Sequence, residues 1–114
     1  MTEPERREFR VDDEGVNPYK LLTAIVVPRP IAWVSTVGPD GVGNLAPHSF
    51  YSVACADPPI VCFTSVGHKD TLRNIRATGE FVVNVASADL LGAVNDSSAP
   101  YDPDVDEAGD LGLE

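Results

Sequence analysis

The sequence predicts a mainly β fold with short helices, arranged as a barrel or a sandwich. Five short segments are rich in β-branched and aromatic residues, and stretches rich in Gly, Pro, Asn and Asp separate them, which is typical of strands joined by turns. With 114 residues, 43% of them hydrophobic, the chain has material for one core. We therefore expect a single small β domain.

The first elements follow a charged start. Residues 1–17 are charged and aperiodic, which predicts an N-terminal arm, and residues 18–114 are assigned to the domain. The domain opens with an ordered entry that leads into the apolar stretch 21–26. Residues 31–36 and 42–45 are predicted to form a hairpin, because the Gly-Pro-Asp-Gly sequence between them is typical of a β-turn.

The central elements are a second strand pair, a helix and a fifth strand. The second pair is expected at residues 49–54 and 60–64, joined by a turn that contains two prolines. A short helix is expected at residues 71–78, with Asp70 or Thr71 as its cap, Leu72 and Ile75 facing the core, and Gly79 ending it in the left-handed conformation. The fifth strand is expected at residues 81–85.

The end of the chain predicts an incomplete barrel. Ser87 can cap a second helix at residues 88–94. Residues 96–114 carry seven carboxylates and no cation, and we expect them to be irregular. Because five strands without a closing strand leave open sheet edges, we expect a truncated domain, marginal by itself, or one that pairs with a second copy.

Charge and composition exclude several function classes. A net charge of −10 and a pI near 4.4 argue against nucleic-acid or anionic-membrane binding, since both need a basic surface. No apolar run is long enough for a membrane span and no signal-peptide core is present, so we expect a cytoplasmic protein. Neither the two cysteines nor the two histidines have metal-ligand spacing, so no metal site is predicted.

The cations of the predicted helix are the clearest functional signal. Lys69, Arg73 and Arg76 are the only positive charges in the last 84 residues, which also hold 12 carboxylates. Their spacing places all three on one face of a helix. An ordinary solvated face would explain any such trio. In so acidic a chain, these three residues, called the cationic stripe below, also predict an anion site, with phosphate as the first candidate.

Several motifs occur in the order found in one protein family. The chain resembles the flavin reductase-like, FMN-binding split-barrel proteins over about residues 18–113. The motifs that carry the resemblance are Arg-Pro-Ile-Ala-Trp-Val-Ser-Thr at 29–36, Asn-Leu-Ala-Pro-His-Ser-Phe at 44–50, Asp-Pro-Pro at 57–59, Lys-Asp-Thr-Leu-Arg-Asn-Ile at 69–75 and Thr-Gly-Glu-Phe-Val-Val-Asn at 78–84.

The resemblance implies an antiparallel split barrel that holds FMN, with FAD as the alternative, and pairs as a homodimer. It implies an NAD(P)H-dependent flavin reductase, in some cases working with a partner oxygenase, whose hydride chemistry belongs to the cofactor and needs no catalytic side chain. The residues that it places at the flavin are Ser35, Thr36, Asn44, Ala46, Ser49, Phe50, Lys69, Asp70 and Thr71. A non-enzymatic flavin binder or electron-transfer protein, another split-barrel phosphate binder and an inactive fragment remain alternatives.

Single residues of these motifs also have structural explanations. Asn44 and Ser49 could cap turns, and Trp33 is favoured as a core aromatic over a flavin-stacking residue. Alternation along a strand allows only one of Ser35 and Thr36 to point inward, and the same holds for Phe50 and its neighbour.

Overall fold

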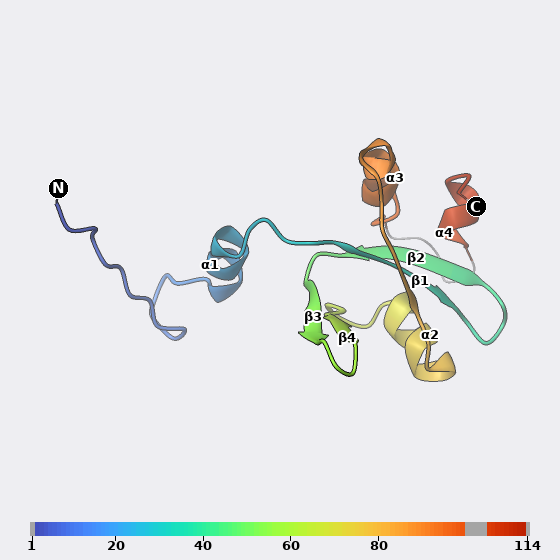
Figure 1. The fold of residues 1–114 in the computed structure, drawn as a ribbon, viewed down its shortest axis with the longest axis horizontal. Helices are drawn as coiled ribbons and strands as arrows, with labels where there is room; N and C mark the ends of the chain where they lie inside the picture. The colour runs from blue at the N-terminus through green and yellow to red at the C-terminus, as the bar shows by residue number, and fades with distance from the viewer. Residues whose placement is uncertain (1, 100–104, 114) are drawn as a thin grey trace.

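The computed structural model describes residues 2–99 and 105–113 and has the predicted composition, mostly β with short helices (Figure 1). The elements are α1 Pro18–Ile25, β1 Ala32–Val37, β2 Gly43–His48, β3 Tyr51–Cys55, β4 Ile60–Phe63, α2 Asp70–Thr78, β5 Val82–Asn84, the 3₁₀ turn η1 Ala88–Leu90, α3 Leu91–Asp96 and α4 Glu107–Asp110. All five predicted strands and both predicted helices are present.

A three-stranded antiparallel sheet in the order β2-β1-β5 forms the centre of the fold. The first predicted hairpin is confirmed, with Ala32 opposite His48 and Thr36 opposite Asn44. Its turn is closed by the bond from the Gly38 amide to the Val42 carbonyl, 2.9 Å. β2 lies at the edge of this sheet. Its Pro47 fits there, because a residue without an N–H group is tolerated on an edge strand.

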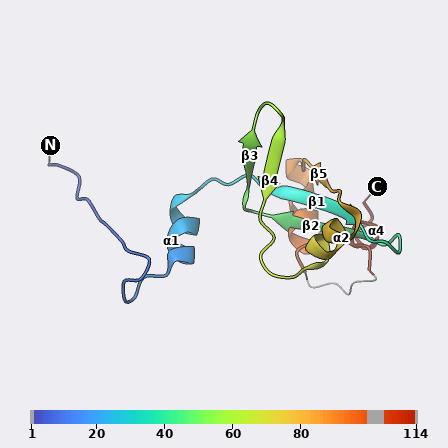
Figure 2. The same ribbon diagram turned by 90° about the horizontal axis from the view of Figure 1, so that it is seen from below.

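The second predicted strand pair, β3 with β4, forms a separate two-stranded sheet. Figure 2 shows this hairpin standing away from the central sheet. Its register places Tyr51 opposite Phe63 and shifts near the turn, between Val53 and Cys55. Most of its side chains are exposed, so the hairpin contributes little to the core.

Helix α2 covers one face of the central sheet, but not in the predicted way. Lys69 occupies the N-cap position and no side chain caps the helix, so the expectation for Asp70 or Thr71 is wrong. The predicted end is confirmed, because Gly79 has φ 77°. The buried residues of the helix are Thr71 and Asn74, and the predicted pair is only partly buried.

The reason for this difference lies in the strands beneath the helix. Thr36 and Asn44 face α2 from paired positions of β1 and β2. The Asn44 amide donates to the Thr71 hydroxyl at 2.9 Å, and the Asn74 amide donates to the Thr36 hydroxyl at 3.1 Å. Polar strand residues therefore meet polar helix residues, and two buried hydrogen bonds hold α2 on the sheet.

The apolar core lies on the opposite face of the sheet, under α3. Trp33, Leu45 and Val94 form the buried cluster. The indole N–H of Trp33 donates to the Ser97 hydroxyl at 2.9 Å, which satisfies the one polar group of this side chain. Trp33 is therefore a core aromatic, as the sequence favoured.

The acidic end of the chain is more ordered than predicted. α4 begins after Asp106, whose carboxylate accepts a hydrogen bond from the Ala108 amide at 3.1 Å. The helix packs against β2, with Ala108 and Leu113 next to the apolar core. The expectation of an irregular tail is thus wrong for residues 107–110, while residues 100–104 and 114 lie outside the described part.

Helix α1 stands apart from the sheets at the far end of an extended connection (Figures 1 and 2). Asn17 caps it by accepting from the Lys20 amide at 3.2 Å, and Pro18 is its first residue. None of its residues is buried. Across the described part of the chain, no helix combines the length and the apolar character that crossing a membrane requires.

Candidate functional site

A cavity of about 420 Å³ lies at β2, between the start of α2 and the segment after α3. Its volume lies in the range of roughly 300–1,000 Å³ that is usual for small-molecule sites. The lining residues come from β2, the start of α2, the segment after α3 and the start of α4: Asn44, Ala46, Pro47, His48, Lys69, Asp70, Thr71, Ser97, Ser98, Ala99 and Glu107.

Five of the nine predicted cofactor residues line this cavity. Asn44, Ala46 and the Lys-Asp-Thr sequence at 69–71 meet there although 22 residues separate Ala46 from Lys69 in the sequence. The side chains of Asn44 and Thr71 are buried and bonded to each other. Of the five, Lys69 is exposed and is the only cation, so it is the member best placed to meet an anion.

The other four predicted residues lie elsewhere. Thr36 is buried under α2, and the Ser35 hydroxyl accepts from the Asn84 amide at 3.1 Å. Both line a smaller hollow with residues 80–82. Ser49 is exposed and does not line the cavity. Four of the nine predicted residues thus lie outside this cavity, and the flavin contacts of all nine stay a prediction.

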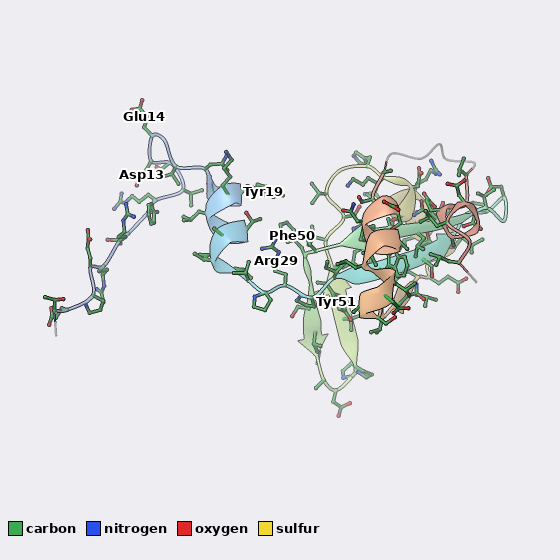
Figure 3. All side chains as sticks on the ribbon, turned by 90° about the horizontal axis from the view of Figure 1, so that it is seen from above. Asp13, Glu14, Tyr19, Arg29, Phe50 and Tyr51 are labelled. Carbon is green, nitrogen blue, oxygen red and sulfur yellow. The ribbon has the colours of Figure 1, made fainter. Side chains whose placement is uncertain are left out.

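Phe50 points toward α1 rather than into the cavity, as Figure 3 shows. Its ring lies 6.3 Å from the ring of Tyr19 and 6.0 Å from the guanidinium carbon of Arg29. Arg29 in turn donates to the carbonyl oxygens of Thr23 and Val26 at the end of α1, at 2.7 and 2.8 Å. This cluster connects α1 to the base of the β3–β4 hairpin and gives Phe50 a structural role.

His48 is a cavity residue that the sequence reasoning missed. Every second residue of a strand lies on the same face, so His48 shares one face of β2 with Asn44 and Ala46. This alternation could have predicted His48 as a cavity residue. The ring is 6% exposed and packs on Phe63, with 4.7 Å between the ring centroids.

The surroundings of His48 favour the neutral form of its ring. Burial lowers the pKa of His48, and the nearby charge of Lys69 lowers it further, while a hydrogen bond to the backbone of Thr64 acts in the opposite direction. Nε2 is buried and has no hydrogen-bond partner among the described residues.

Glu107 closes the cavity from the α4 side, and no local pattern indicated it. Its side chain is buried and accepts a hydrogen bond from the Leu45 amide at the outer edge of β2, at 2.9 Å. Burial is the main cause that raises the pKa of Glu107, and the nearby carboxylates of Asp70 and Asp106 raise it as well. The bond from Leu45 favours the ionised form but does not offset the burial.

The raised pKa of Glu107 gives a prediction for pH dependence. A raised folded-state pKa means that protonation favours the folded chain, so this contribution is complete below the ordinary value of 4.5 and is lost as pH rises through the raised pKa. Glu107→Gln keeps an oxygen acceptor for Leu45 without the charge. We expect its melting temperature to exceed that of the wild type by a few degrees at pH 7, with the difference vanishing at pH 4. A Gln variant that melts lower at pH 7 would mean that the charge itself holds Leu45.

The predicted cationic stripe is present but is divided between two hollows. Lys69 lines both the cavity and a second hollow of about 340 Å³, whereas Arg73 and Arg76 line only the second. The Arg73 guanidinium pairs with the Asp70 carboxylate at 3.1 Å. The charge of Asp70 is thus partly compensated, and Lys69 is the only cation among the residues that line the cavity. Within residues 2–99 and 105–113, no cluster of His, Cys, Asp or Glu is arranged to hold a metal ion.

The fold of this chain is that of the split-barrel proteins. It matches a putative flavin reductase with split barrel domain from Shewanella frigidimarina NCIMB 400 with a TM-score of 0.74 and 21% identity, covering 88% of this chain and 52% of that one. The chain belongs to the flavin reductase like domain family, whose model matches residues 24–113. Its fold agrees with that of nitrilotriacetate monooxygenase component B from Bacillus cereus, with a TM-score of 0.82 and 30% identity, covering 97% of this chain and 57% of that one.

Two further proteins support the assignment. The 2-nitrobenzoate 2-nitroreductase NbaA of Pseudomonas fluorescens matches with a TM-score of 0.78 and 30% identity, covering 93% of this chain and 53% of that one. An uncharacterized protein of Aquifex aeolicus (strain VF5) is 38% identical over 112 residues, which are 93% of this chain and 57% of the relative. The chain spans about half the length of the curated relatives that it matches.

Proposed function

We propose that this chain binds FMN in the cavity at the edge of β2 and forms part of an NAD(P)H-dependent flavin reductase. The observation that carries the proposal is the position of the exposed Lys69, the only cation among the lining residues, in a cavity of small-molecule size. The membership in the flavin reductase like family supports the choice of a flavin over other phosphate-bearing ligands.

The charge of Lys69 fits a phosphorylated ligand, because a cation in the cavity can meet the phosphate. Ser97 and Ser98 also line the cavity, but their hydroxyls already donate to the carbonyls of Val94 and Asn95. The cavity also contains two carboxylates. Asp70 is paired with Arg73, which partly compensates its charge, and burial raises the pKa of Glu107 above its ordinary value. When bound, FMN would supply the hydride-accepting ring, while the protein supplies position and electrostatics.

The remaining parts of the proposal concern partners. We propose NADH or NADPH as the electron donor, FMN in preference to FAD, and a cytoplasmic location. The outer edge of β5 and the exposed apolar side chains of Val82 and Val85 suit pairing with a second copy. The similarity to nitrilotriacetate monooxygenase component B also makes a partner oxygenase part of this proposal.

The proposal is tested by FMN titration of the wild type and of Lys69→Ala. A charge-assisted contact to phosphate contributes about 1.5–3 kcal/mol, so we expect affinity to fall by roughly tenfold or more. Arg76→Ala is the matched control, because Arg76 lies on the same helix but lines only the second hollow.

Three outcomes decide between the alternatives. A wild-type chain that binds no FMN contradicts the proposed function and favours an inactive part of a flavoprotein. An equal loss of FMN affinity in the two variants would mean that Lys69 acts only through the general surface charge and makes no specific contact. FMN binding without NADH or NADPH oxidation would support the non-enzymatic flavin binder instead.

A further inference from the structure

The second hollow, beside α2, gathers cations that the fold leaves mostly unpaired. Its lining residues are His68, Lys69, Asp70, Leu72, Arg73 and Arg76, which include every Lys and Arg of residues 31–114. Like charges three and four residues apart on one helix face repel each other, so this grouping weakens α2. Asp70 pairs with Arg73 at 3.1 Å, and within the described ranges no carboxylate pairs with Lys69 or Arg76. An anion in the hollow would turn the repulsion into attraction.

The charge of the rest of the chain directs a polyanion to this hollow. The chain has a net charge of −10, and of the 12 carboxylates in residues 31–114 only Asp70 lines the hollow. Three cations there face one carboxylate. Because a hollow lined by one sign of charge concentrates ligands of the opposite sign, a ligand with several negative charges is repelled by the acidic surface and attracted here.

The side chains of the hollow indicate a nucleoside that carries a phosphate monoester. Arg73 and Arg76 line the hollow and not the cavity, so an anion that they bind is distinct from one that Lys69 meets in the cavity. Guanidinium groups bind phosphate through two parallel N–H bonds, and they also stack on planar rings such as adenine. Leu72 adds an apolar wall. A phosphorylated adenosine would use all three properties of this lining.

Such a group distinguishes the two electron donors of the proposed reaction. NADPH carries a phosphate at the 2′-oxygen of its adenosine, where NADH carries a hydroxyl, and arginine is a usual partner of that phosphate. Lys69 and Asp70 line both the hollow and the cavity, so the two adjoin. A dinucleotide with its adenosine in the hollow can therefore extend toward the proposed flavin site.

We propose that the second hollow binds the 2′-phosphoadenosine end of NADPH, that Arg73 and Arg76 hold the 2′-phosphate, and that these two arginines make the protein prefer NADPH over NADH. This inference rests on the proposed flavin reductase function and gives its electron donor a binding site. Arg76 is the more important of the two, because Asp70 already pairs with Arg73.

The first test measures binding and needs neither flavin nor turnover. The wild-type chain is titrated with NADP⁺ and with NAD⁺, which differ only in the 2′-phosphate, at one fixed ionic strength in a calorimeter. We expect NADP⁺ to bind roughly tenfold or more tightly, as for a charge-assisted hydrogen bond. Arg76→Gln should remove most of this difference. Lys20→Gln is the matched control, because Lys20 is an exposed cation of α1 outside the hollow and its loss should leave the difference in place.

Steady-state kinetics of the FMN-loaded chain give an independent readout. In Arg76→Gln we expect the KM for NADPH to rise roughly tenfold or more while kcat stays the same, since the 2′-phosphate is remote from the reacting ring. The KM for NADH and the affinity for FMN should not change. Arg76→Lys, which keeps the charge but loses the two-bond geometry, should recover part of the affinity for NADPH.

Several results would overturn the inference. Equal affinity of the wild type for NADP⁺ and NAD⁺ does so whether or not the chain binds FMN. A preference for NADP⁺ that survives in both Arg76→Gln and Arg73→Gln would place the 2′-phosphate elsewhere. If inorganic phosphate displaces NADP⁺ at similar concentrations, the hollow is a general anion site without nucleotide selectivity. A preference for NADP⁺ that depends on Arg76 in a chain that binds no FMN would support the ligand of the hollow and contradict only the proposed flavin site.

Discussion

Trp33→Ala is expected to cause the largest loss of stability of any substitution considered for this chain. Trp33 is 5% exposed, belongs to the buried cluster under α3 and ties that cluster to Ser97. Truncating a buried tryptophan costs about 3–5 kcal/mol, which is comparable with the whole stability of about 5–15 kcal/mol of a typical domain. We expect the melting temperature of the variant, followed by far-ultraviolet circular dichroism, to fall by roughly ten degrees or more below that of the wild type.

The control for this prediction is a substitution of an exposed residue on the same side of the fold. Val85 is 95% exposed, so Val85→Ala should change stability by no more than about 0.5 kcal/mol. Circular dichroism is needed because Trp33 is the only tryptophan, and its fluorescence disappears with the substitution. If Trp33→Ala melts at the same temperature as Val85→Ala, the cluster under α3 is not the core of this domain.

Thr71→Val is expected to have the second largest effect, although the two side chains have nearly the same shape. Thr71 is 1% exposed, and its hydroxyl accepts the hydrogen bond of the Asn44 amide. Valine leaves that buried amide without its partner, which costs about 1–3 kcal/mol. We expect a clear decrease of the urea midpoint with an unchanged slope, since the folded state keeps its compactness.

The same substitution at the end of the helix provides the control. Thr78 is exposed and bonds only to the Asn74 carbonyl of its own helix, at 2.9 Å. Thr78→Val should therefore cost much less than Thr71→Val. Equal losses would mean that the cost comes from placing a β-branched apolar residue in α2, and that the bond to Asn44 does not matter for stability.

Local patterns were enough to predict most of the elements. The hairpin of β1 and β2 was predicted because its turn chemistry lies between two β-rich segments, and the end of α2 because Gly79 tolerates a positive φ. The face of α2 was predicted wrongly. Apolar periodicity favoured Leu72 and Ile75, but the strands beneath present Thr36 and Asn44, which no pattern within the helix can reveal.

The candidate site was predictable where its residues are neighbours in the sequence. Lys69, Asp70 and Thr71 were found together because the cationic stripe and the helix start coincide. Ser97 and Glu107 were missed because they are distant in sequence from the strand residues that they contact. Ser97 bonds to Trp33 of β1 across 64 residues and Glu107 bonds to Leu45 of β2 across 62, and only the fold brings them together. Phe50 was placed at the flavin by resemblance, whereas in the structure it packs beside Arg29.

The bonds that hold the central sheet to its helices differ greatly in the length of chain that each one closes. The strands β1 and β2 join across a tight turn, the bond between Asn44 and Thr71 spans 27 residues, and the bond between Trp33 and Ser97 spans 64. Loop-closure entropy grows with the length of the loop, and long-range contacts form slowly. We therefore expect the β1–β2 hairpin to form first during folding, α2 to dock next and α3 to dock last. Weakened contacts of α3 would then mainly accelerate unfolding and leave the folding rate nearly unchanged.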